Sequence, residues 1–204
     1  GNVSAWAPSA PAGSSTVRLD RSDPSAPTVA GGSLAWQSVT SVSITASGST
    51  DAGGSGPAAY EHRTSTNGGA TWSSAAAGAP VTVSAQGETL VELRAVDGAG
   101  NTSAWVPATV RIDRTAPSAP SVAGGSSSWQ ASGPVGISAS GSTDTGGSGL
   151  APYEYRTSLN GGAWSAATAG AAANVAAEGT TQVQFRSVDG AGNASAWTKG
   201  SATA

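Results

Sequence analysis

The segment VELRAVDGAGNTSAW, from Val91 to Trp105, returns almost unchanged as VQFRSVDGAGNASAW, from Val183 to Trp197. Before the Gly-rich turn of each segment, apolar and polar residues alternate with a period of two. This pattern is typical of a β-strand that buries one face. The chain opens on GNVSAW, Gly1 to Trp6, which matches only the end of the segment. The sequence is therefore built from a repeat, and the repeat must determine the fold.

The repeat has the length of a small β-sandwich. Gly100 and Gly192, which precede the equivalent asparagines Asn101 and Asn193, are 92 residues apart. Each unit contains about seven short alternating runs, and NGG turns at Asn67 and Asn160 predict hairpins. We therefore predict an all-β fold of two tandem immunoglobulin-like β-sandwiches, with no helix. The expected boundaries are 1–22 for the last strand and linker of a preceding repeat, 23–114 for the first repeat and 115–204 for the second.

Three motifs carry a resemblance to a known family. VDGAGNTSAW, IDRTAPSAP and YEYRTSLNGGAWS resemble the tandem bacterial Ig-like repeats of large surface proteins, and the likeness covers both units. The resemblance implies an extracellular or cell-surface location. It also implies a structural role as a stalk, spacer or adhesive module. Within that role we predict a stalk, filament or adhesin spacer, with neighbouring repeats or identical subunits as partners.

Composition excludes several classes of function. The chain has 204 residues, no cysteine, 10% charged residues and a net charge of −3, so it lacks thiolate metal sites and the basic stripe of a nucleic-acid-binding protein. No apolar run reaches the roughly 18 residues that insertion into a membrane requires. His62 is the only histidine and has no nucleophile partner in sequence. We therefore predict no catalytic residue, no enzyme activity and no cofactor other than calcium.

Two sets of aspartates are candidate calcium ligands. In a tandem sandwich, the incoming linker meets the loops that follow the second and sixth strands. The linker residue Asp113 should therefore lie beside Asp144 and Asp189, and Asp20 beside Asp51 and Asp97. Three carboxylates and nearby carbonyls could supply the six to eight oxygens that calcium prefers. The alternative is that Arg21 and Arg114, next to the linker aspartates, neutralise the loop carboxylates by pairing.

Tryptophans and charged residues recur at fixed places in the repeat. We interpret the tryptophans as packing residues, with Trp72 and Trp164 beside the hairpin as the candidates for glycan binding, as in an accessory module of a secreted enzyme. We expect a charged ladder across two central strands of each repeat, formed by Glu61, Arg63, Glu92 and Arg94 and repeated by Glu154, Arg156 and Arg186. Such pairs are most simply register-fixing contacts.

The ends of the chain suggest two alternatives. STVRLD, Ser15 to Asp20, is a well-formed strand without a sandwich of its own, whereas the last strand carries Ala202 and Ala204 where the first repeat has Val110 and Ile112. Val17 and Leu19 could complete the terminal sandwich of another subunit, which would assemble head to tail. The competing interpretation is that both ends are boundaries of a fragment.

The segments NVS, NTS and NAS are formal glycosylation sequons at Asn2, Asn101 and Asn193. In turns flanked by glycine, these asparagines are more simply explained by their tolerance of left-handed backbone torsions.

Overall fold

A computed structural model describes residues 17–199 of the chain. The predictions for Trp6, Ala202 and Ala204 lie outside these residues. The described part is all-β and forms antiparallel sheets, so the predicted fold class is confirmed. Residues 17–199 contain no helix that could cross a membrane.

The first repeat is a sandwich of a three-stranded and a four-stranded sheet. Its three-stranded sheet has the order β1-β2-β5, and its four-stranded sheet has the order β4-β3-β6-β7. The strands are β1 (Thr28–Ala30), β2 (Val42–Ser47), β3 (Pro57–Ser65), β4 (Ala76–Ala77), β5 (Val81–Val83), β6 (Gly87–Asp97) and β7 (Val106–Ile112).

The second repeat has the same strand order. Its sheets are β12-β9-β8 and β11-β10-β13-β14. The strands are β8 (Ser121–Gly124), β9 (Val135–Ser140), β10 (Glu154–Leu159), β11 (Thr168–Ala169), β12 (Ala172–Val175), β13 (Thr181–Arg186) and β14 (Thr198–Lys199). Because no strand is shared between the repeats, each sandwich has its own pair of sheets.

Alternation along the strands builds the two cores. In β6, Val91, Leu93 and Ala95 are fully buried while the residues between them face outward. Val91 and Leu93 pack with buried aliphatic residues of the other strands: Ile44, Val81, Val83, Val110 and Ile112. The core of the second repeat is smaller, and its buried members are Ala139, Ala173, Val183 and Phe185. The second sandwich therefore depends much more on one large side chain.

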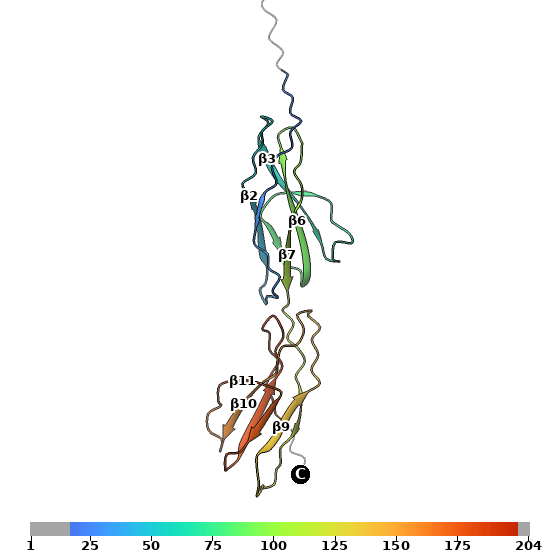
Figure 1. Ribbon diagram of the computed structural model, residues 1–204. Helices are drawn as coiled ribbons and strands as arrows, with labels where there is room; N and C mark the ends of the chain where they lie inside the picture. The colour runs from blue at the N-terminus through green and yellow to red at the C-terminus, as the bar shows by residue number, and fades with distance from the viewer. Residues whose placement is uncertain (1–16, 200–204) are drawn as a thin grey trace, which may run out of the picture.

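The register of the central strands confirms the predicted charged ladder. Glu61 of β3 lies opposite Arg94 of β6, and Arg63 lies opposite Glu92. Figure 1 shows the two sandwiches end to end, with the linker after β7 leading into the loops of the second repeat. The predicted calcium ligands lie at the linker ends of the repeats, and the arginines and tryptophans lie on the outer faces of the four-stranded sheets.

Candidate functional site

Each group of predicted aspartates converges at the linker end of its repeat. Asp113, Asp144 and Asp189 each offer a carboxylate oxygen, and the three oxygens lie within 4.8 Å of one another. Asp20, Asp51 and Asp97 do the same at the first repeat. Whether either group binds calcium stays a prediction.

Asp113 is the buried centre of the junction. It is fully inaccessible to solvent. Its Oδ1 accepts a hydrogen bond from the Thr115 N–H at 2.9 Å, and its Oδ2 accepts one from the Ser148 N–H of the second repeat at 3.0 Å. A Cβ atom at position 146 would overlap the Asp113 carboxylate, so only glycine fits there. In the first repeat, a Cβ atom at position 53 would likewise overlap the Asp20 carboxylate.

Hydrogen bonds keep the linker aspartates anionic. Burial raises the pKa of Asp113, but hydrogen bonds from Ser148 and Thr115 outweigh burial, so this pKa lies below its ordinary value of 3.8. The pKa of Asp20 is lowered by hydrogen bonds from Ser55 and Ser22. For Asp97, burial again raises the pKa, and bonds from Asn101 and neighbouring N–H groups reverse the shift. Carboxylates that are charged at neutral pH are therefore held side by side.

The expected pairing of Arg114 with the loop carboxylates is wrong. Its Nη1 donates to the carbonyl oxygens of Thr40 at 3.0 Å and Ser84 at 3.2 Å, both in the first repeat. The guanidinium therefore lies against backbone carbonyls of the first sandwich and not against the aspartates. Within residues 17–199, the ion pairs join arginines only to glutamates, and Arg21 pairs with no carboxylate.

The sequence analysis missed the role of two asparagines. Asn193 Nδ2 donates to Asp189 Oδ2 at 2.7 Å and to the Asp113 carbonyl at 3.0 Å, so it ties the turn to the linker. Asn101 makes the equivalent bonds to Asp97 and Asp20. The expected left-handed torsion is wrong for both, because Asn160 is the one non-glycine residue with positive φ among the described residues. The preceding Gly100 and Gly192 adopt it instead, at φ 94° and 89°.

The tryptophans of the four-stranded sheets alternate with arginines in stacks. In the first repeat, the Arg63 guanidinium lies 4.8 Å from the Trp72 ring centroid and 4.6 Å from that of Trp105, and the Arg94 guanidinium lies 4.5 Å from the Trp105 centroid. We call this series the first ladder. The second ladder is Trp164, Arg156, Trp197 and Arg186, with spacings of 4.4–4.6 Å. All four rings are half-buried, and sugar binding at Trp72 and Trp164 stays a prediction.

Glutamates complete the ladders. Arg63 and Arg94 are each paired with a glutamate at 2.6–2.7 Å, and Arg186 is paired with Glu154 at 2.7 Å. Each cation–π contact contributes about 0.5–1 kcal/mol. The ladders therefore cover the outer sheet face and fix its register.

Trp36 and Trp129 occupy equivalent positions but different surroundings. Trp36 rests against Gly147 of the second repeat, where a Cβ atom would come 2.9 Å from its ring. Trp129 is 83% exposed. Gly54, the equivalent of Gly147, has no heavy atom of residues 17–199 within 4 Å of a Cβ position. Each side of the Trp36–Gly147 contact therefore recurs without its partner: Trp129 is an exposed tryptophan, and Gly54 is a glycine with no tryptophan of residues 17–199 against it. We call Trp129 and Gly54 the unfilled halves of the interface.

The remaining predicted residues lie apart from these clusters. Val17 is 87% exposed and Leu19 is 68% exposed, in an extended segment that pairs with no strand of residues 17–199. His62 lies in β3, with its Nδ1 3.0 Å from the Gly78 carbonyl oxygen.

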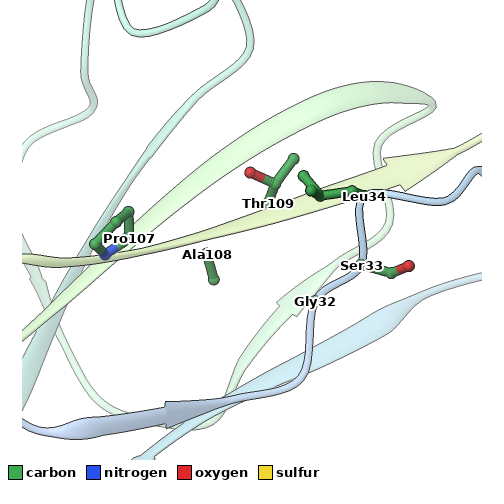
Figure 2. Close-up of a pocket in the computed structure, with 6 residues that line it drawn as sticks. All are labelled: Gly32, Ser33, Leu34, Pro107, Ala108 and Thr109. Carbon is green, nitrogen blue, oxygen red and sulfur yellow. The ribbon is translucent and has the colours of Figure 1, made fainter.

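A shallow depression of about 300 Å³ lies between β7 and the loop after β1. Figure 2 shows its lining, with Leu34 beside Thr109 and with Pro107 and Ala108 along the strand. The lining offers no titratable side chain, so the depression presents no acid–base chemistry.

No protein-family model matches the sequence. No curated protein is significantly similar to it. Solved structures with a similar backbone include the FN1–FN3 domains of chicken CNTN1, at 17% identity and a TM-score of 0.35, covering 86% of this chain and 65% of that chain. They also include chitinase ChiA74 from Bacillus thuringiensis, at 15% identity and a TM-score of 0.35, covering 92% of this chain and 29% of that chain. This chain thus spans less than two thirds of either protein, and the sandwich assignment rests on its own strand order.

Proposed function

We propose that the chain is a non-catalytic spacer of an extracellular or cell-surface bacterial protein, in which successive sandwiches are held in one fixed relative orientation. The motif resemblance supports the class of protein. The junction between the repeats supports the mechanical role, because a spacer needs linkers that do not bend freely.

One observation carries the proposal: the consecutive linker residues Asp113 and Arg114 form hydrogen bonds with different sandwiches. Arg114 donates to carbonyls of the first repeat, while the Asp113 carboxylate accepts from the Ser148 N–H of the second. Asn193 of the second repeat also donates to the Asp113 carbonyl, and Trp36 packs against Gly147. The backbone torsions of the linker are therefore fixed from both sides.

Spin labels test this rigidity. The chain has no cysteine, so Ala76→Cys in β4 and Thr168→Cys in β11 place labels on equivalent exposed strands. Double electron–electron resonance is expected to give one narrow distance distribution. Asp113→Ala should broaden it, because the Ser148 and Thr115 N–H groups lose their acceptor.

The control for that experiment is Asp20→Ala. Asp20 accepts a bond from the Ser55 N–H at 2.9 Å, as Asp113 does from Ser148, but at the entrance of the first repeat. The control should leave the distribution narrow. A broad distribution in the unsubstituted protein, or the same narrow one in Asp113→Ala, would contradict the proposal.

We propose that calcium reinforces the junction. Three carboxylate oxygens within 4.8 Å of one another suit calcium–oxygen distances of about 2.3–2.6 Å. Each carboxylate oxygen has two acceptor sites, so the N–H bonds at these aspartates leave acceptor capacity for a cation. The same labelled protein gives the readout: calcium should sharpen the distribution and raise the melting temperature. If it does neither, and calorimetry detects no heat, the ion has no part in the junction.

We propose further that identical subunits associate head to tail through the unfilled halves of this interface. Trp129 would rest on Gly54 of a second copy, as Trp36 rests on Gly147. Val17 and Leu19 would act as a donated strand, since their equivalents Val110 and Ile112 are fully buried. A contact between unlike surfaces propagates and does not close.

Sedimentation velocity over a range of concentrations measures this association. We expect larger species at higher concentration, and Trp129→Ser should shift them towards monomer. Leu34→Ser is the control, because Leu34 is also an exposed apolar residue but lies beside Thr109 of β7, in a different repeat from Trp129 and outside the loop that carries Gly54. A sedimentation coefficient independent of concentration would exclude the association.

A further inference from the structure

The two ladders differ at one position that changes the charge of the sheet face. In the first ladder, Arg63 Nε and Nη2 contact Glu92 Oε2 at 2.7 and 2.6 Å. In the second, Arg156 Nε and Nη2 donate to Gln184 Oε1 at 3.0 and 2.7 Å. The geometry is the same, but an amide has replaced a carboxylate. Arg156 is therefore hydrogen-bonded without being neutralised.

The neighbouring strand adds a second charge to the same row. Lys199 of β14 lies opposite Gln184, whereas Pro107 of β7 lies opposite Glu92. Residues opposite one another on antiparallel strands project to the same face. The second repeat therefore carries a row of Arg156, Gln184 and Lys199, and Lys199 is exposed.

The outer faces of the two four-stranded sheets differ in net charge. The outer face of the first four-stranded sheet has arginines at 63, 94 and 111, each paired with a glutamate. In the strands of the second four-stranded sheet, Arg156, Arg186 and Lys199 stand against one carboxylate, Glu154. The second face is thus cationic in a chain whose net charge is −3.

We propose that this cationic face, formed by Arg156, Arg186 and Lys199 and flanked by Trp164 and Trp197, binds an acidic polysaccharide. A guanidinium presents a planar fork that matches a carboxylate. The half-buried Trp164 ring is contacted by one arginine, where the Trp197 ring is contacted by two, so Trp164 offers apolar surface to a sugar ring. The proposal restricts the glycan prediction to the second repeat and to Trp164.

Charge density favours an acidic polysaccharide over a nucleic acid. Nucleic-acid affinity grows with the number of phosphates that the protein neutralises. Three cations on an acidic chain give few such contacts. A polyuronate carries one carboxylate per sugar, which matches isolated cations separated by flat rings.

The experiment measures binding of the full chain to sodium alginate, a polyuronate, with dextran as the neutral polymer and single-stranded DNA as the competing polyanion. Gln184→Glu restores the pair of the first ladder, and Lys199→Gln removes the second charge. Each is expected to weaken alginate binding by roughly fivefold, and binding should weaken as salt rises.

A transfer experiment gives the matched control. Glu92→Gln places the Arg–Gln arrangement in the first ladder and is expected to strengthen alginate binding. Melting curves confirm that each variant is folded, and the Gln184→Glu variant is isosteric, so a loss of binding with an unchanged melting curve reports charge. The proposal is overturned if the unsubstituted chain does not bind alginate or if Gln184→Glu binds it equally well. Equal binding of dextran or of DNA also overturns it.

Discussion

Replacing Phe185 with alanine is expected to unfold the second repeat while the first remains folded. Phe185 is fully buried and packs 5.7 Å from the Tyr155 ring, and the other buried members of its cluster are no larger than valine. Removing a buried phenylalanine costs about 3–5 kcal/mol. At roughly 0.05–0.15 kcal/mol per residue, a domain of about 90 residues is stable by about 4.5–13.5 kcal/mol. The small core of the second repeat places it at the low end of this range, so the loss approaches its whole stability.

Leu93→Ala is the matched substitution, since Leu93 holds the same position in the first repeat. Six other buried aliphatic residues surround it, so its cost of about 2–5 kcal/mol should leave the first repeat folded at room temperature. Urea denaturation followed by peptide-resolved hydrogen exchange assigns each transition to a repeat. A single transition that Phe185→Ala lowers for both repeats would show that they unfold as one unit.

Trp105→Ala is expected to cost the first repeat about 3 kcal/mol. The guanidinium groups of Arg63 and Arg94 lie 4.6 and 4.5 Å from the centroid of this ring. The substitution removes two cation–π contacts and the apolar cover over β3 and β6.

Trp105→Phe separates the two contributions. Phenylalanine keeps apolar cover but offers a weaker ring for cations, so it should recover roughly half of the lost stability. Denaturant midpoints measured in low and high salt provide the test. Equal midpoints for Trp105→Ala and the unsubstituted protein would mean that the stack is incidental to stability.

The fold was predictable because its signals are local and repeated. Alternation in VELRAVD and VQFRSVD fixes which residues of β6 and β13 face the core, and the copied sequence fixes a common strand order. The same reasoning placed Glu61 opposite Arg94. The aspartates could be assigned to one end of each sandwich because that inference needs only loop position, not side-chain torsion.

The details of the sites could not be derived in this way. The contact of Trp105 with two arginines depends on how the chain approaches β7, which no short motif encodes. Arg114 had carboxylates and carbonyls within possible reach, and the choice depends on the spatial arrangement of loop carbonyls. Asn101 and Asn193 bond to linkers some 80 residues earlier in the chain, so their role emerges only once the repeats are assembled.

The hydrogen bonds from the linker to both sandwiches also govern how the chain would respond to tension along its axis. A pull on the two ends reaches Asp113 and Arg114 through the last strand of the first repeat, and neither residue can move without breaking bonds to a different body. The linker therefore cannot lengthen under a small force before these hydrogen bonds break. The load passes directly into the sheets, and the sandwich with the smaller core, the second, would yield before the connection between the two.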